Sequence, residues 1–236
     1  MLTNQWLALI ITIVVALLWL RLNDFFAHRA WISASLSRKI IHMGTGPIFV
    51  CCWLLFPELP MSRYLAAVVP LLITAQFALV GSGLINDQAV VDAMSRTGDR
   101  KEILRGPLYY GIVFTVLTIL YWKDNPIGIV ALMLMCGGDG LADIIGKRFG
   151  GSRLPWSKQK SWAGSLAMFA GGVVFTAGVL AIFAAANLVP KSLQVSFPAL
   201  SLVALGGTFI ESFPFRDIDN LTVPVVAAVL GHLLLV

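Results

Sequence analysis

The chain has 236 residues, of which 58% are hydrophobic and only 12% are charged, about half the charged fraction of an ordinary soluble domain. Its mean hydropathy of +0.85 indicates an integral membrane protein. Because a helical span takes roughly 20 residues, seven or eight spans leave no room for a soluble domain. We therefore predict a single membrane-embedded domain over residues 1–236.

Apolar runs separated by charged or Pro/Gly/Asn-rich breaks predict an all-α, polytopic helical bundle of seven or eight transmembrane helices. The first run has no basic residue before it and Arg21 after it, the reverse of a cleavable signal peptide, so we expect it to be retained. The remaining spans follow at short intervals, and the last two are short. The runs lie near residues 5–20, 40–56, 64–85, 107–122, 126–145, 162–186, 197–211 and 221–236.

Basic residues gather in alternate loops. The loops after the first, third, fifth and seventh predicted spans hold 14 of the 17 Lys and Arg residues. Cytoplasmic loops retain basic residues, so we expect both termini outside and these loops in the cytoplasm. The placement explains the pI near 9.3 without a nucleic-acid partner, because loop cations can meet anionic head groups or a phosphorylated ligand.

Three acids fall inside predicted spans, namely Asp139, Asp143 and Glu211. An ionisable group in a span is costly unless it is paired or hydrated, so such groups are functional candidates. Asp139 and Asp143 are four residues apart and share one face of a helix. Glycines around Asp139 would allow close backbone approach or a helix break. The alternative is that Lys147 and Arg148 neutralise both aspartates at an ordinary helix end.

The loop after these aspartates carries five basic residues and no acid over residues 147–160. Together with two carboxylates it suits a magnesium nucleotide, because carboxylates hold the metal and cations hold the phosphates. Loops on the cytoplasmic side are basic in any case, so the loop alone does not decide the matter. Ser161 can cap the next helix, whose N-terminal dipole would face an anion.

More polar groups are predicted at the same cytoplasmic end. Arg38 and His42 are four apart at the start of the second span, where a lone histidine can also be an ordinary hydrogen-bonded residue. Asp87 and Arg105 lie at the ends of a charge-balanced connector that otherwise reads as a solvated amphipathic segment. Glu211 ends the seventh span. We therefore predict one site at this end of the bundle.

Four segments of the sequence are distinctive: GDGLADIIGKRFGGSRLPWSKQKSWAGSLAMF (138–169), RKIIHMGTG (38–46), SRTGDRKEILRGPLYY (95–110) and FIESFPFRDIDNLTVP (209–224). They resemble the CTP-dependent polyprenol kinases, which include phytol, farnesol and dolichol kinases, and the longest segment is most similar to phytol kinases. The resemblance implies transfer of the γ-phosphate of CTP, or UTP, to a long-chain isoprenoid alcohol, giving phytyl monophosphate from phytol. Such a product would serve chlorophyll-phytol salvage and tocopherol or quinone supply.

The resemblance places the GD-x-x-AD element on Asp139 and Asp143, and the KS-x-x-GS element on residues 160–165. From the chemistry of phosphoryl transfer, we expect the two aspartates, with Asp87, to hold Mg²⁺. One aspartate could act as base, and His42 or Glu211 would orient the hydroxyl or the metal. The nucleotide would be bound by Lys147, Arg148, Lys158, Lys160, Ser161, Gly164, Arg38 and Arg105.

Two alternatives stay open at this point. A cytidylyltransferase similar to CDP-diacylglycerol synthase would use the same nucleotide but send the γ-phosphate into pyrophosphate. A transporter would line a pathway with the buried acids, although the outer halves of the spans are nearly all apolar. The expected partners are an isoprenoid alcohol from the bilayer and a nucleoside triphosphate from the cytosol. Short loops and the lack of a transit peptide favour a bacterial plasma or thylakoid membrane.

Overall fold

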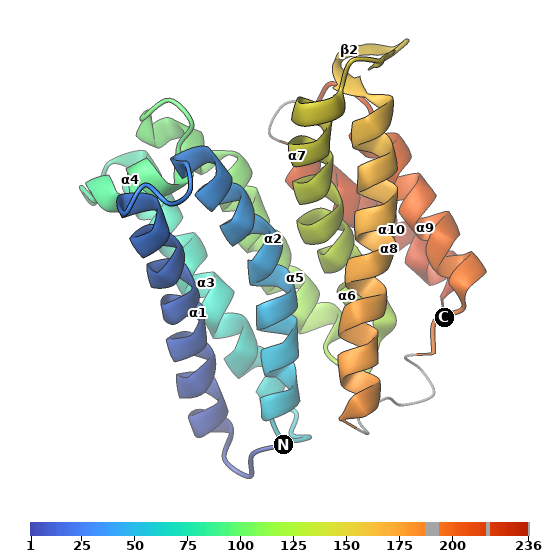
Figure 1. Ribbon diagram of the computed structural model, residues 1–236. Coiled ribbons are helices and arrows are strands. Elements are labelled where there is room, and N and C mark those ends of the chain that lie inside the picture. The colour runs from blue at the N-terminus through green and yellow to red at the C-terminus, as the bar shows by residue number, and fades with distance from the viewer. Residues whose placement is uncertain (187–193, 216–217, 236) are drawn as a thin grey trace.

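The computed structural model describes residues 1–186, 194–215 and 218–235. The chain forms a bundle of helices with one small β-hairpin (Figure 1). In this bundle η1 and η2 are 3₁₀ turns and η3 is a π-helical turn. The elements are α1 (Gln5–His28), α2 (Ala34–Cys52), η1 (Trp53–Leu55), α3 (Ser62–Ser82), α4 (Gln88–Met94), η2 (Arg100–Leu104), α5 (Gly106–Tyr121), α6 (Pro126–Met133), η3 (Leu134–Gly138), α7 (Asp139–Phe149), β1 (Arg153–Leu154), β2 (Ser157–Ser161), α8 (Trp162–Ala185), α9 (Phe197–Glu211) and α10 (Asp219–Leu234).

The predicted all-α bundle is confirmed, and each of the eight predicted spans corresponds to a helix. Within the described ranges, five helical stretches are long and apolar enough to cross a membrane. They are α1, α3, the stretch from η2 through α5, the stretch from α6 through α7, and α8. The other three segments are 19 residues in α2, 15 in α9 and 16 in α10. Lys191 and Arg216, two of the residues used to assign the loops, lie outside the described residues.

The helices extend further at one end than the apolar runs predicted. α1 continues to His28, eight residues past the predicted end. Within this extension Asn23 is buried, and its side-chain amide donates to the carbonyl of Trp19 at 2.8 Å. Ser37 of α2 in turn donates to the carbonyl of Asn23 at 3.3 Å. The polar extension is therefore stable because its buried polar groups are paired within α1 and with α2.

The longest buried segment is the central helix formed by α6, η3 and α7. Residues 126–138 of this helix are all buried. α1, α2, α3 and α5 lie on one side of it, and α8, α9 and α10 lie on the other (Figure 1). A helix that is apolar all round is expected at the centre of a bundle. The charged half, α7, begins immediately after the π-helical turn, so the same helix carries both the core and the two aspartates.

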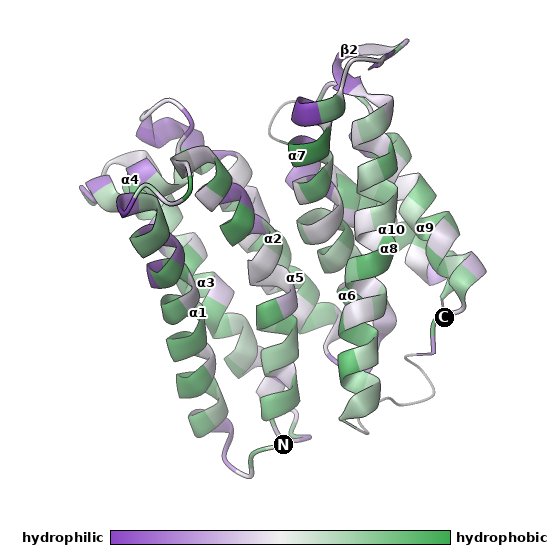
Figure 2. Cartoon of the chain, in the orientation of Figure 1, coloured by the Kyte–Doolittle hydropathy of each residue, from purple (hydrophilic) through white to green (hydrophobic). Residues whose placement is uncertain are grey.

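Charge is concentrated at one end of the bundle. The α1–α2 turn, α4, and the β1–β2 hairpin all lie at the end opposite the N-terminus (Figure 1). We call it the basic end. Hydrophilic residues gather there, whereas the middle parts of the helices are mostly hydrophobic (Figure 2). The predicted grouping of the first, third and fifth loops is thus seen in the fold. The antiparallel β1–β2 hairpin was not predicted, because its sequence, with a polar β2 reading SKQKS, has no apolar alternation.

Candidate functional site

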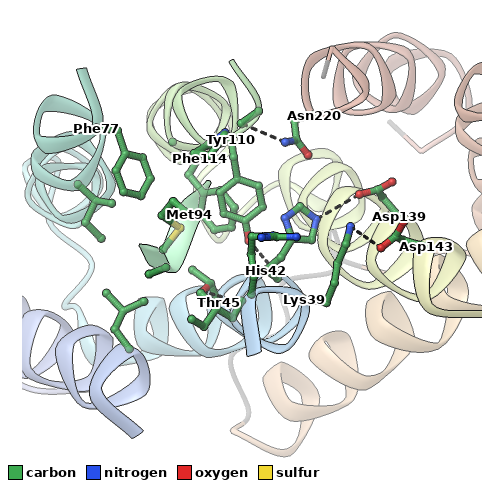
Figure 3. A pocket seen from close by; sticks show the side chains of 18 of the residues that line it. Lys39, His42, Thr45, Phe77, Met94, Tyr110, Phe114, Asp139, Asp143 and Asn220 are labelled. Atoms are coloured by element: carbon green, nitrogen blue, oxygen red, sulfur yellow. Dashed lines mark hydrogen bonds and ion pairs between the residues drawn. The ribbon is translucent and has the colours of Figure 1, made fainter. Parts of the chain in front are cut away.

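A cavity of about 850 Å³ extends from the basic end into the bundle. Its lining comes from α1, α2, α3, α4, η2, α5, α7, the hairpin, and the facing ends of α8, α9 and α10. Figure 3 shows that its two sides differ in chemistry. Charged side chains of α2 and α7 lie on one side, and aromatic side chains such as Phe77 and Phe114 lie on the other.

The first polar contact joins α2 to the central helix. His42 Nε2 donates to the carbonyl oxygen of Met135 at 3.1 Å and lies 3.4 Å from Asp139 Oδ2. Met135 belongs to the π-helical turn, a type of irregularity that is frequent at functional sites. Both neighbours of Nε2 are hydrogen-bond acceptors, so Nε2 carries a proton and a neutral ring has its lone pair on Nδ1.

Asp143 lies one turn beyond Asp139, between two lysines. Lys39 Nζ of α2 is 3.2 Å from Asp143 Oδ2, and Lys147 Nζ of α7 is 2.8 Å from the same oxygen. The side chain of Lys147 is 70% exposed, whereas that of Lys39 is 18% exposed. Lys147 therefore does pair with Asp143, as the alternative of an ordinary helix end expects. The more buried partner of Asp143, however, is Lys39, which comes from another helix.

A second buried ion pair joins the hairpin to α9 at the edge of the cavity. Lys160 of β2 pairs with Glu211 at the end of α9, whose side chain is 4% exposed. Next to this pair, Trp156 Nε1 donates to Ser212 Oγ at 3.0 Å, which also fastens the hairpin to α9. Burial lowers the pKa of Lys160, but the Glu211 carboxylate, together with the charges of Asp139 and Asp219, outweighs burial, so that the pKa is raised. Lys160 therefore remains a cation facing the cavity.

Close backbone contact between α7 and α8 shapes the wall between these pairs. A Cβ at Gly164 would lie 3.2 Å from the carbonyl oxygen of Ala142 and 3.4 Å from the Cα of Gly146. The two helices can approach this closely because both contact positions are glycine. Ser161 Oγ accepts from the N–H of Gly164 at 3.1 Å, so the predicted cap of α8 is confirmed. The N-terminus of α8 thus opens directly beside α7.

Ten of the predicted site residues line the cavity: Arg38, His42, Asp87, Asp139, Asp143, Lys147, Lys160, Ser161, Gly164 and Glu211. Three predicted phosphate-binding residues are not among the lining residues. Arg148 lies over the ring of Phe149, at 5.4 Å from its centroid. Lys158 is exposed on the hairpin, and Arg105 is exposed at the start of α5. These three positions were predicted from loop composition, which does not fix the direction of a side chain.

Asp87 is separated from the other two metal candidates. Its carboxylate caps α4 by accepting from the N–H of Val90 at 3.1 Å, and it accepts from Gln76 at 3.4 Å. Among the described residues, no three acidic, histidine or cysteine side chains form a group that could hold a metal. The expected trio of aspartates is thus not assembled. Asp139 and Asp143 still fit a magnesium nucleotide, for which one or two carboxylates suffice when phosphates supply further ligands.

Three contributors to the site were missed from the sequence. Lys39 is three residues before His42 and therefore on the same helix face, a signal that was present in the spacing. Tyr110 of α5 donates to the carbonyl of His42 at 2.7 Å, and the two rings are 4.6 Å apart. Asn220 of α10 donates to the carbonyl of Gly106 at 3.0 Å. The contacts of Tyr110 and Asn220 join distant segments, and nothing local in the sequence marks them.

Curated relatives decide the family. A probable chloroplastic phytol kinase of Triticum aestivum is 42% identical over 216 residues, which cover 91% of this chain and 72% of the relative. One from Zea mays is 39% identical, covering 91% and 71%. Phytol kinase 1 of Arabidopsis thaliana, also named chloroplastic, is 33% identical over 204 residues, covering 86% and 67%. The chain belongs to the phytol kinase family.

Membership of this family favours a kinase over both the cytidylyltransferase and the transporter. No family model and no solved structure matches the chain. These three relatives are plant proteins whose names carry the word chloroplastic. They therefore give no support to the expected bacterial plasma membrane.

Proposed function

We propose that this phytol kinase family member transfers the γ-phosphate of CTP, or UTP, to a long-chain isoprenoid alcohol, with phytol as the first candidate. The product would be phytyl monophosphate, a precursor for tocopherol or quinone side chains. The observation that carries the proposal is a cavity with ion-paired acids and bases at its charged side and an apolar interior. A charged nucleotide and a lipid-soluble alcohol can meet in such a cavity at the cytoplasmic surface of the membrane.

The acids and cations divide between metal and phosphate. Asp139 and Asp143 would hold Mg²⁺, which when bound offsets the negative charge of the nucleotide phosphates. Lys39 and Lys147 both pair with Asp143. With phosphate present they would divide their hydrogen bonds between this carboxylate and the phosphate oxygens. Lys160, held as a cation by Glu211, would stabilise charge on the transferred group.

His42 is the base that the geometry favours. Because Nε2 is held by Met135 and Asp139, Nδ1 is the nitrogen free to accept a proton. In the proposed step the alcohol oxygen bonds to the γ-phosphorus, the bond from that phosphorus to the β–γ bridging oxygen breaks, and the nucleoside diphosphate leaves. The hydroxyl proton passes to His42 Nδ1. Asp139 then lies beside the imidazolium and stabilises its charge.

The test is label transfer from γ-labelled CTP to phytol in membranes that contain Asp139→Asn or Asp143→Asn. We expect each variant to lose about 100-fold or more of the wild-type rate at equal protein level. Asp124→Asn is the matched control, because Asp124 is exposed and lies between α5 and α6, away from the cavity. Near-normal transfer by both site variants would contradict the site. Label in pyrophosphate rather than in lipid would favour the cytidylyltransferase.

A further inference from the structure

The apolar part of the cavity is lined mainly by four helices, α1, α2, α3 and α5, and Met94 of the short helix α4 lies beside Phe77 and Phe114 (Figure 3). On α2 the lining positions recur at intervals of three and four residues, and on α3 and α5 they recur every four residues, as expected when a single face of each helix is presented. These helices come from the side of the bundle away from α8, α9 and α10 (Figure 1). The apolar lining includes Val15, Ala16 and Leu20 of α1, Ile41, Ile48 and Cys52 of α2, Val69, Ile73 and Phe77 of α3, and Pro107 and Phe114 of α5.

Hydroxyl groups in this wall are occupied by the protein itself. Thr12 Oγ1 donates to the carbonyl of Ala8 at 2.8 Å, and Thr45 Oγ1 donates to the carbonyl of Ile41 at 2.6 Å. Tyr110 donates to the carbonyl of His42. Since these donors are used within or between helices, the wall offers a ligand methyl groups and ring faces rather than hydrogen bonds. A polar ligand would lose its hydration there without replacement.

The length of the apolar part matches a lipid chain. Along α2 the lining extends ten residues beyond His42, to Cys52, a distance of about 15 Å at the helical rise. The hydrocarbon core of a bilayer is about 30 Å thick, or roughly 15 Å for each leaflet. The whole cavity, about 850 Å³, is within the usual range for sites that enclose a small ligand.

The deep end of this space adjoins a second apolar groove. That groove is lined by Val15 of α1 and by residues of α2, together with Leu55 of η1 and Ile182 of α8. It shares Val15, Ile48 and Cys52 with the large cavity. A chain in the cavity would therefore have its far end next to an apolar groove of the bundle, where it can exchange with the bilayer.

The geometry points to a chain-binding tunnel between α1, α2, α3 and α5, in which the isoprenoid tail lies with its hydroxyl at His42 and its far end near Val15 and Cys52. This inference rests on the proposed function, because the alcohol is its occupant. It separates two binding regions in one cavity. The nucleotide occupies the charged side formed by α2, α7 and the hairpin, and the tail occupies the four-helix side.

Two adjacent valines on α1 give a matched test. Val15 lines the deep end, whereas Val14 is 47% exposed and is not among the lining residues. Counted from the basic ends of α1 and α2, Val15 lies about 8 Å deeper than His42. The experiment measures kcat/KM of Val15→Trp and Val14→Trp for geraniol, farnesol and phytol, three alcohols of increasing chain length, with γ-labelled CTP.

We expect Val15→Trp to lower kcat/KM for phytol about tenfold relative to geraniol, because the indole overpacks only the deep end of the tunnel. Val14→Trp should keep the wild-type ratio. Ile48→Trp, on the facing helix α2, should reproduce the effect of Val15→Trp. The tunnel would be overturned if both Val15→Trp and Ile48→Trp kept the wild-type ratio of kcat/KM for phytol to kcat/KM for geraniol. An equal loss of kcat/KM for all three alcohols in both variants would have the same meaning.

The same assay distinguishes this failure from failure of the proposed function. If the wild-type protein transfers label to phytol and the deep variants leave the ratio unchanged, the kinase stands and the tunnel is wrong. If the wild-type protein transfers label to none of the alcohols, the proposed function itself is wrong and the tunnel falls with it.

Discussion

The buried pair of Lys160 and Glu211 allows a structural role to be separated from a role in phosphoryl transfer. Lys160→Met removes the cation and leaves a carboxylate whose side chain is only 4% exposed. Breaking a buried ion pair from one side typically costs about 3–5 kcal/mol, because the remaining charge is uncompensated. The side chain of Lys160 is 23% exposed, so water relieves part of this cost and we expect the lower value, about 3 kcal/mol.

In a chain of this size, such a loss corresponds to a thermal midpoint about 6–12 °C lower. The double variant Lys160→Met/Glu211→Leu removes both charges and should regain most of the lost stability, since apolar replacement of a buried pair is often neutral. The two assays are thermal unfolding in detergent and transfer of γ-label to phytol. If Lys160 stabilises the transferred phosphoryl group, the double variant recovers its midpoint but not its activity. Recovery of both would refute that role and leave Lys160 as a purely structural residue.

Two further predictions concern single residues at the basic end. His42→Gln should lower kcat about 100-fold with little change in KM for CTP, because the general base is lost. The control is His232→Gln, since His232 lies beside Tyr121 and away from the cavity, and it should leave kcat unchanged. Equal losses of kcat in the two variants would argue against His42 as the base. Ser161→Ala should destabilise the protein by about 1 kcal/mol through loss of a helix cap and raise KM for CTP. Ser196→Ala, which removes the cap of α9, should affect stability alone, and an equal rise in KM would contradict a nucleotide site at α8.

The sequence was sufficient for the helices because a membrane imposes a simple rule on apolar runs. Their number and order could be predicted from length and hydropathy alone. Their ends could not, since polar extensions are stabilised by contacts with other helices. In the extension of α1 to His28, the buried Asn23 pairs its side-chain amide within α1, and its backbone carbonyl accepts a further hydrogen bond from Ser37 only when α2 packs beside it. The hairpin was missed for a similar reason, because its polar strands are held to α9 by Lys160 and Trp156.

At the site, residue types were predictable and partners were not. An acid inside a span is expensive, so Asp139, Asp143 and Glu211 are conspicuous in the sequence alone. Each acid, however, takes a partner from another part of the chain: His42, Lys39 and Lys160 lie 97, 104 and 51 residues from their acids. Such pairings depend on helix packing and leave no local pattern. Composition located the charged end correctly, but it also suggested Arg148 and Lys158, which do not line the cavity.

These pairings also bear on how one small bundle would bind the two proposed ligands, which have opposite polarity. The pairs His42–Asp139 and Lys39–Asp143 both join α2 to the central helix. They therefore hold the four-helix side of the bundle against the side that carries the hairpin. A nucleotide that draws Lys39 towards its phosphates would weaken one link, while an alcohol at His42 would engage the other. Because α2 carries both links and also lines the proposed tunnel, we expect occupation of the tail region and of the phosphate region to be coupled through this helix.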